Sequence, residues 1–272
     1  MEFFIQHIPT IFALMCTGVF AGLLAGLLGV GGGIVIVPVL YFLFQAFGVS
    51  AESAMVVATA TSLATIVPTS ISSIRAHSSK GNVDFALLKI WGPFILAGVL
   101  IGSWLVTRID GDWLTMLFGI IATLSALNML FGSKKPIAKN LPGIAGQSVM
   151  ATNVGLFSSL VGIGGGTLTV PILTFCNYPA HKAVGTAAAV GLLISLPAAF
   201  TMLIVGTAPS DAPFGTVGLV NLVGFVCIVP LTVLFAPLGA SLASKLDAQK
   251  LKKIFAVVLM FTGVRMLGQL FL

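Results

Sequence analysis

Two glycine-rich segments of this chain carry the residue pattern that points most clearly to a binding site. Residues 29–38 read GVGGGIVIVP, and residues 162–171 read GIGGGTLTVP. Glycine disfavours a helix by about 1 kcal/mol relative to alanine, so each cluster predicts a break in an apolar helix. A helix that restarts after such a break presents unpaired N–H groups and the positive end of its dipole, which together bind anions. We therefore expect an anion site at these breaks, built from Gly31, Gly32, Gly33, Gly164, Gly165 and Gly166.

Hydroxyl side chains and one arginine extend this candidate site. Thr59 and Ser62 lie in the segment after the first break, and Thr186 lies at the matching place after the second. Hydroxyls donate hydrogen bonds to anions, although Ser and Thr in helices also bond to their own backbone. Arg265 lies well inside a predicted span, where a charge is costly and often functional. Its distance from Leu272 also allows its side chain to reach the outer membrane surface.

Packing is the alternative role for the glycines. Gly18, Gly22 and Gly26 are four residues apart, a spacing that lets two membrane helices approach closely. The same G-x-G-G-G-x4-P pattern in both halves favours a shared role at the breaks over packing alone. Neither copy has the Lys-Ser/Thr ending of a phosphate loop, which disfavours an ATP site.

The composition indicates where these residues must sit. The chain has 272 residues, of which 58% are hydrophobic and only 7% charged, whereas about a quarter of a soluble domain is charged. Apolar windows of about 20 residues, long enough to cross a bilayer, separate the charged clusters.

We predict an all-α integral membrane protein, a polytopic bundle of about eight spans, or ten segments if each broken hairpin counts as two. The broken stretches are 8–48 and 143–177, and the spans lie near 52–74, 86–107, 113–132, 182–205, 217–243 and 254–272. Whether the glycine hairpins are re-entrant or full spans is open at this stage.

An internal repeat organises these segments. Residues 29–40 match 162–173 at a shift of 133, and residues 93–130 match 230–267 at a shift of 137. The chain therefore divides into a first transmembrane repeat (1–133), a linker (134–139) and a second repeat (140–272).

The charges of the loops predict the orientation of the two repeats. Lys and Arg accumulate in 75–89, 134–139 and 245–253, which the positive-inside rule places in the cytoplasm. The matching loops 108–112 and 206–216 are then outside, as are both termini. The repeats are therefore inverted relative to each other, which is a common plan for secondary transporters that work by alternating access.

Several other classes of protein are disfavoured. The net charge of +6 resides in short loops, without Arg-rich arms or stacking motifs, so we expect no nucleic-acid partner. Cys16, Cys176 and Cys227 are scattered without metal-ligand spacing, and we expect no metal and no cofactor. The Gly-x-Ser-Gly and His-Glu-x-x-His motifs of intramembrane proteases are missing, so we expect no enzyme. The sequence leaves a homodimer open.

The paired segments GLLGVGGGIVIVPVL and SLVGIGGGTLTVPIL, followed by ATATS and GTAAA, resemble the TauE/SafE sulfite-exporter family over essentially the whole chain. That resemblance implies a multi-pass permease of the bacterial inner membrane with about eight spans. It also implies a small anionic substrate such as sulfite or an organosulfonate like sulfoacetate. The leading hypothesis is a secondary carrier of such anions, and the alternative is a channel-like facilitator for another small anion.

Overall fold

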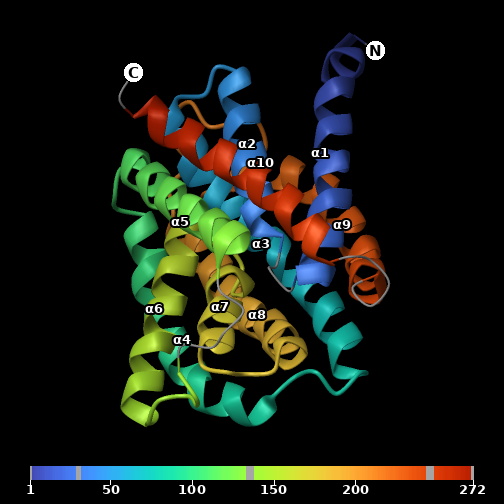
Figure 1. Cartoon of the computed structure of the whole chain (residues 1–272). Helices are drawn as coiled ribbons and strands as arrows, with labels where there is room; N and C mark the ends of the chain where they lie inside the picture. The colour runs from blue at the N-terminus through green and yellow to red at the C-terminus, as the bar shows by residue number, and fades with distance from the viewer. Residues whose placement is uncertain (1, 29–31, 133–137, 243–247, 271–272) are drawn as a thin grey trace.

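The computed structural model describes residues 2–28, 32–132, 138–242 and 248–270, which form ten helices and one short hairpin of strands (Figure 1). Six of these helices, namely α3, α4, α5, α6, α8 and α9, are long and apolar enough to cross a bilayer. The predicted class, an all-α polytopic membrane protein, is confirmed. In chain order the elements are α1 (Glu2–Leu28), α2 (Gly33–Ala46), α3 (Ala51–Ser78), α4 (Phe85–Val106), α5 (Gly111–Phe131), α6 (Ile144–Val161), α7 (Gly166–Phe175), α8 (Ala180–Ile204), β1 (Thr216–Val217), β2 (Val220–Asn221), α9 (Leu222–Leu242) and α10 (Ala248–Gln269).

One predicted span begins later than expected. The stretch 217–243 is helical only from Leu222, because β1 and β2 pair antiparallel just before it. Gly218 lies in the turn between the strands with φ 58°, a left-handed value that glycine adopts without strain. Asn221 then starts α9, since its side-chain Oδ1 accepts a 2.8 Å hydrogen bond from the Gly224 N–H.

The helices that follow the glycine breaks are too short to cross a membrane. At about 1.5 Å per residue, the 14 residues of α2 extend about 21 Å and the 10 residues of α7 about 15 Å. A bilayer core is about 30 Å thick. We call α2 and α7 the half-helices.

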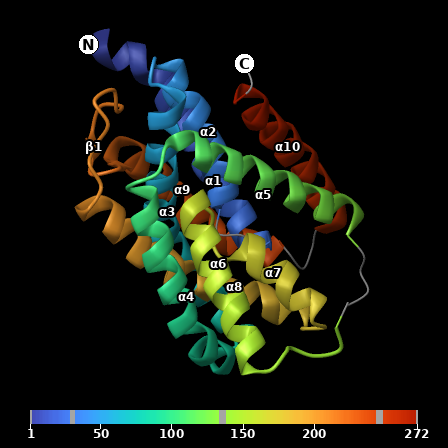
Figure 2. The same ribbon diagram turned by 90° about the vertical axis from the view of Figure 1, so that its left-hand side faces the viewer.

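Both half-helices turn back toward the end of the bundle from which the chain came. The Trp91 indole N–H donates a 3.1 Å hydrogen bond to Gln147, so α6 begins beside the start of α4. The Tyr178 hydroxyl bonds to Asp84, so α7 ends beside the start of α4 as well. Figures 1 and 2 show the corresponding path for α1 and α2 at the opposite end, where α10 also ends. Each hairpin therefore begins and ends at the same end of the bundle, and its second helix is too short for a full span. That both hairpins are re-entrant in the membrane is a prediction.

The helix contacts recur when the first five helices are exchanged for the last five. α3 and α8 pack together in the middle, and each contacts the half-helix of its own half. Around them α1 packs on α9 just as α6 packs on α4, and α5 packs on α10. Contacts of this kind follow from two units related by a twofold axis. The repeat boundaries 1–133, 134–139 and 140–272 stay a prediction.

Glycines set the spacing of the outer helix pairs. A Cβ added to Gly22 would lie 2.8 Å from the Thr232 carbonyl oxygen, and one added to Gly155 would lie 2.3 Å from that of Ile95. The predicted packing role of Gly18 and Gly22 is therefore confirmed, with α9 as the partner helix. Gly155 makes the matching approach between α6 and α4.

Large apolar side chains cover the outer surface of the bundle. In water such a surface would drive aggregation, whereas lipid tails solvate it. The outward residues lie on several helices and include Phe12, Phe20, Leu100, Trp104, Leu124, Phe200, Val226 and Phe261.

Candidate functional site

The two glycine breaks lie against each other inside the bundle. The Ser62 hydroxyl of α3 donates a 2.7 Å hydrogen bond to the Gly162 carbonyl, which ends α6. A Cβ added to Gly33 would lie 2.6 Å from the same oxygen, so only glycine lets α2 start so close to the other break. Gly162 has φ 72° and Gly32 has φ 75°, left-handed values that non-glycine residues rarely adopt. The glycines at the breaks are therefore required by backbone conformation and by close approach.

The structure brings most of the predicted glycines together at this point. Gly32, Gly33, Gly164, Gly165 and Gly166 are all buried there, and α7 begins at Gly166. A Cβ on Gly165 would lie 2.5 Å from the Val190 side chain of α8. Gly31 lies outside the described residues.

A cavity of about 520 Å³ leads to the start of α7. It runs between α7 and α5, and parts of α1, α2, α8 and α10 complete its wall. This volume lies within the range of about 300–1,000 Å³ that is typical of small-molecule sites. Most lining side chains are apolar, and the polar ones are Ser125, Asn128, Thr167 and Thr174. We call this space the α7 cavity.

Thr167 is the most informative residue in the α7 cavity. It is the second residue of α7, and only 7% of its surface is exposed. Its Oγ1 has no hydrogen-bond partner among the described residues, whereas Thr174 Oγ1 is bonded to the carbonyls of Val170 and Pro171. A buried hydroxyl without a partner costs free energy, so this one is available to a ligand that can pair with it. The N–H groups of the first helical turn likewise have no partner within the helix.

The field in the α7 cavity comes from the backbone. None of its described lining residues is Asp, Glu, Lys, Arg or His. The start of α7 therefore supplies roughly half a positive charge without an ionised side chain beside it. A helix start of this kind favours negative charge beside it.

The predicted threonines of α3 and α8 lie elsewhere. Thr59 is buried beside Gly162, with its Oγ1 unpaired among the described residues, and is not part of the α7 cavity lining. Thr186 accepts a 2.9 Å hydrogen bond from the Asp84 N–H at the start of α4. The corresponding bond in the other half, 2.8 Å from the Asn221 N–H at the start of α9, goes to Thr61. The structural counterpart of Thr186 is therefore Thr61, and the predicted equivalence of Thr59 and Thr186 is not found.

Arg265 does not reach the α7 cavity. Its side chain is exposed on α10, and its Cζ lies 4.3 Å from the centre of the Phe42 ring of α2. This cation–π contact joins α10 to the other half-helix.

An aspartate forms hydrogen bonds just beyond the C-terminal end of each half-helix. At the α7 end, Asp84 accepts hydrogen bonds from the Tyr178 hydroxyl and the Leu87 N–H, which hold the pKa of its carboxyl below the usual range. Burial and the nearby carboxylate raise the pKa of Tyr178.

At the opposite end, Asp211 takes the corresponding role beside the end of α2. It accepts 2.6 Å and 2.8 Å bonds from the Ser53 hydroxyl and the Ser50 N–H, which lower its pKa to about 2. We call these two arrangements the aspartate clasps.

The sequence interpretation missed several polar residues of the cavity. Thr167 lies inside the quoted GIGGGTLTVP segment and lines the α7 cavity. Ser125 and Asn128 lie three apart in α5, and this polar pair within a membrane span was the available signal.

The spanning helices, the half-helices and the buried breaks define a polytopic helical membrane protein with a cavity between α5 and α7. Residues 14–266 match the family model "Sulfite exporter TauE/SafE", so the chain belongs to this family. It is 33% identical over 259 residues to a "Probable membrane transporter protein" of Haemophilus influenzae, covering 94% of this chain and 98% of that protein. A protein of Bacillus subtilis, "Probable membrane transporter protein YunE", is 28% identical over 93% of this chain and 96% of its own length. No solved structure matches the chain. These names describe transporters, in agreement with the expectation that the chain is not an enzyme.

Proposed function

We propose that this transporter carries a small sulfur-containing anion, such as sulfite or an organosulfonate, and that the anion binds at the start of α7. The observation that carries the proposal is the buried, unpartnered Thr167 hydroxyl where α7 begins, at one wall of the α7 cavity. An anion there gains the helix dipole, the free N–H groups of the first turn and one hydroxyl donor. The description of the family supports sulfite and related anions as the substrate class.

The α7 cavity faces the cytoplasm in this proposal. The end of the bundle at which α7 finishes carries Arg75, Lys80, Lys89, Lys139 and Lys182, and positive loops stay inside. Both termini are then outside, across a bacterial inner membrane. Cysteines at Lys139 and Asp110, labelled with an impermeant reagent in intact cells, test this orientation. We expect labelling of Asp110→Cys alone, and labelling of Lys139→Cys alone would reverse the orientation.

The Thr167 hydroxyl provides the direct test of the site. Thr167→Val keeps the shape of the side chain and removes its donor, which should cost about 1–3 kcal/mol of binding. The affinity for sulfite or sulfoacetate, measured by calorimetry on purified protein, should fall roughly 5- to 150-fold. The apparent Tm without ligand should not fall, because the hydroxyl has no partner to lose.

Thr174→Val is the matched control. Its hydroxyl lines the same cavity on the same helix, but it is already bonded to backbone carbonyls. Affinity should therefore stay within about twofold of the parent. Equal affinities for the parent and both variants would place the anion elsewhere. Saturable counterflow in proteoliposomes supports a carrier, whereas currents at channel rates support the facilitator.

A further inference from the structure

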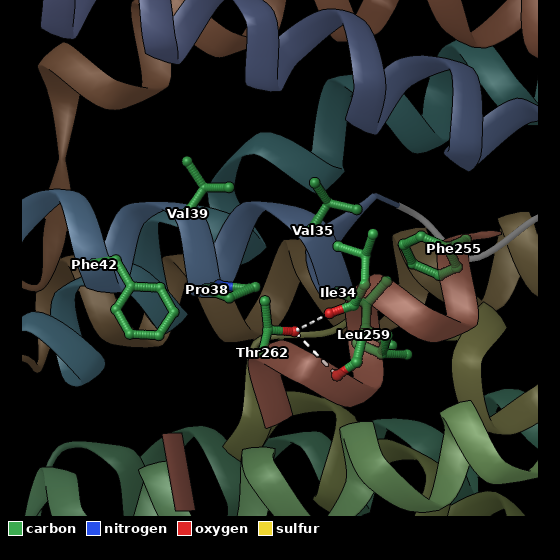
Figure 3. Close-up of a pocket in the computed structure, with 9 residues that line it drawn as sticks. Ile34, Val35, Pro38, Val39, Phe42, Phe255, Leu259 and Thr262 are labelled. Carbon is green, nitrogen blue, oxygen red and sulfur yellow. Dashed lines mark hydrogen bonds between the residues drawn. The ribbon is translucent and has the colours of Figure 1, made fainter. Parts of the chain in front are cut away.

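A second, smaller cavity lies between the other half-helix and the other terminal helix. It has a volume of about 100 Å³ and lies between α2 and α10, as Figure 3 shows. Its described wall is almost entirely apolar, and the one polar side chain among the described lining residues, Thr262, is bonded back to carbonyls of its own helix. We call it the α2 cavity.

The α2 cavity occupies the position in one half that the α7 cavity occupies in the other. Along α2, residues Ile34, Pro38 and Phe42 line it at the positions that Thr167, Pro171 and Phe175 hold in α7. Along α10, Val258 and Thr262 match Ile121 and Ser125 of α5 at the repeat shift of 137. The two cavities are therefore counterparts in the repeat, one about five times the volume of the other.

The two cavities meet at a shared wall. Ile34 of α2 and Phe255 of α10 line both of them. A rearrangement of these two apolar side chains would join the cavities into one route past the glycine breaks. The wide part of this route would lie beside α7 and the narrow part beside α2.

One pair of counterparts differs in charge and in placement. Asn128 of α5 lines the α7 cavity, and its counterpart is Arg265 of α10. Arg265 is stacked on Phe42 at 4.3 Å instead, so a ring that lines the α2 cavity is tied to α10. Phe175, the counterpart of Phe42, lines the open cavity.

Two further bonds tie α2 to α10 beyond this stack. The Tyr41 hydroxyl donates a 3.0 Å hydrogen bond to Gln269 Oε1, and Gln269 Nε2 donates a 3.3 Å bond to Gln45 Oε1. Side-chain contacts therefore join α2 to α10, whereas the α7 cavity separates the corresponding helices α7 and α5.

We propose that the α2 cavity is the closed form of a second access route to the breaks, and that Arg265 stacked on Phe42 is its gate. The proposal rests on the proposed transport function. When this route opens, Arg265 takes the position that Asn128 holds in the α7 cavity. An anion then meets a guanidinium on the α2 side and an amide on the α7 side.

Thiol labelling of matched positions tests the gate without any substrate. Val39 and Ile172 are counterparts, both half-buried, and each lines one of the two cavities. In a background without Cys16, Cys176 and Cys227, Ile172→Cys should react with a small thiol reagent faster than Val39→Cys. Adding Arg265→Gln or Phe42→Leu should speed the labelling of Val39→Cys roughly 2- to 5-fold, the equilibrium shift that loss of one exposed cation–π contact gives. Combining both changes should add little, because either one removes the same contact.

Arg108→Gln is the matched control. Arg108 also lies over an aromatic ring, Trp104, at 5.7 Å, but outside both cavities, so its loss should leave Val39→Cys labelling unchanged. The proposal is overturned if neither Arg265→Gln nor Phe42→Leu changes that labelling, or if Val39→Cys already reacts as fast as Ile172→Cys. Because sulfite is not in the assay, these outcomes are independent of the Thr167 result. The use of two gate variants guards against one that misfolds.

Discussion

The α7 cavity and the α2 cavity are built from corresponding helices, yet one has about five times the volume of the other. Their half-helices begin at similar glycine breaks and carry a proline at the same place, Pro38 in α2 and Pro171 in α7. Their side chains differ at the edge of each cavity, where Arg265 is stacked on Phe42 on the α2 side and its counterpart Asn128 lines the cavity on the α7 side. Two copies of one unit can thus share a backbone plan while their side chains leave cavities of very different volume.

The start of each half-helix differs in a second respect. Gly33 begins α2 close to the Gly162 carbonyl oxygen, which accepts a hydrogen bond from Ser62. The start of α7 adjoins the unpaired Thr167 hydroxyl and the open cavity. The asymmetry therefore extends from the cavities to the breaks themselves.

The largest expected effect comes from alanine at the left-handed glycines. Gly162→Ala places a Cβ at φ 72° and 2.8 Å from the Thr59 Cα, which combines conformational strain with overpacking. It should lower the free energy of unfolding by roughly 2–5 kcal/mol. Gly32→Ala has similar strain but meets its nearest atom only at 3.0 Å, so it should cost about 1–2 kcal/mol.

Thermal unfolding of both variants in detergent measures this difference. Gly48→Ala is a useful reference, since Gly48 also has a positive φ but no atom within 4 Å of an added Cβ. If Gly32→Ala lowered the Tm more than Gly162→Ala, the break before α2 would be more closely packed than the break before α7.

A smaller effect is expected at the packing glycines of the outer helix pairs. Gly155→Ala should cost more than Gly22→Ala, because its Cβ would lie 2.3 Å rather than 2.8 Å from a facing carbonyl oxygen. Both changes overpack a helix interface, at about 1–3 kcal/mol each. The apparent Tm reports the order, and Gly143→Ala, with nothing within 4 Å, serves as the neutral control. Equal losses would mean that the α4–α6 and α1–α9 interfaces adapt equally well.

The smallest effect is expected from the aspartate clasps. The pKa of Asp211 in the folded protein, about 2, lies below the value near 3.9 of an unfolded aspartate. Its contribution to stability is therefore complete above about pH 5 and is lost as the pH falls toward 2. Asp211→Asn should lower the apparent Tm slightly at pH 7, and the gap to the parent should narrow between about pH 5 and pH 3. The effect is small because the carboxylate is exposed and screened.

Asp84→Asn tests the same property at the α7 end. Its pKa is also lowered, by the Tyr178 hydroxyl and the Leu87 N–H, so the pH dependence should have the same sign. A Tm gap that stays constant with pH for both variants would show that the clasps do not act through their charge.

Much of this fold was predictable because its signals are local. Length and apolarity define the spans, and the glycine clusters define the breaks, since backbone conformation depends on the residues at that point. The late start of α9 was not predicted, because residues 217–220 of the strand pair read VGLV and continue the apolar run of the helix that follows.

The candidate site was less predictable, because it depends on rotation about helix axes. Aligning VATATS with VGTAAA pairs Thr59 with Thr186, but the contacts pair Thr61 with Thr186. Two residues turn a helix by about 200°, which moves a hydroxyl to the opposite face. The contact of Arg265 with Phe42 depends likewise on tertiary packing between distant segments, which no local pattern reports.

The lack of ionised side chains around the described α7 cavity has an electrical consequence. Helix dipoles and hydroxyls stay with the protein and neutralise no net charge, so an anion that crosses alone carries its full charge through the membrane. Moving one charge through 100 mV is worth about 2.3 kcal/mol, equivalent to a concentration ratio of about 50. A cell whose interior is negative would thereby expel a monoanion through this protein by its membrane voltage alone. Collapsing the voltage with a potassium ionophore should then abolish export against a concentration gradient and leave only movement down that gradient.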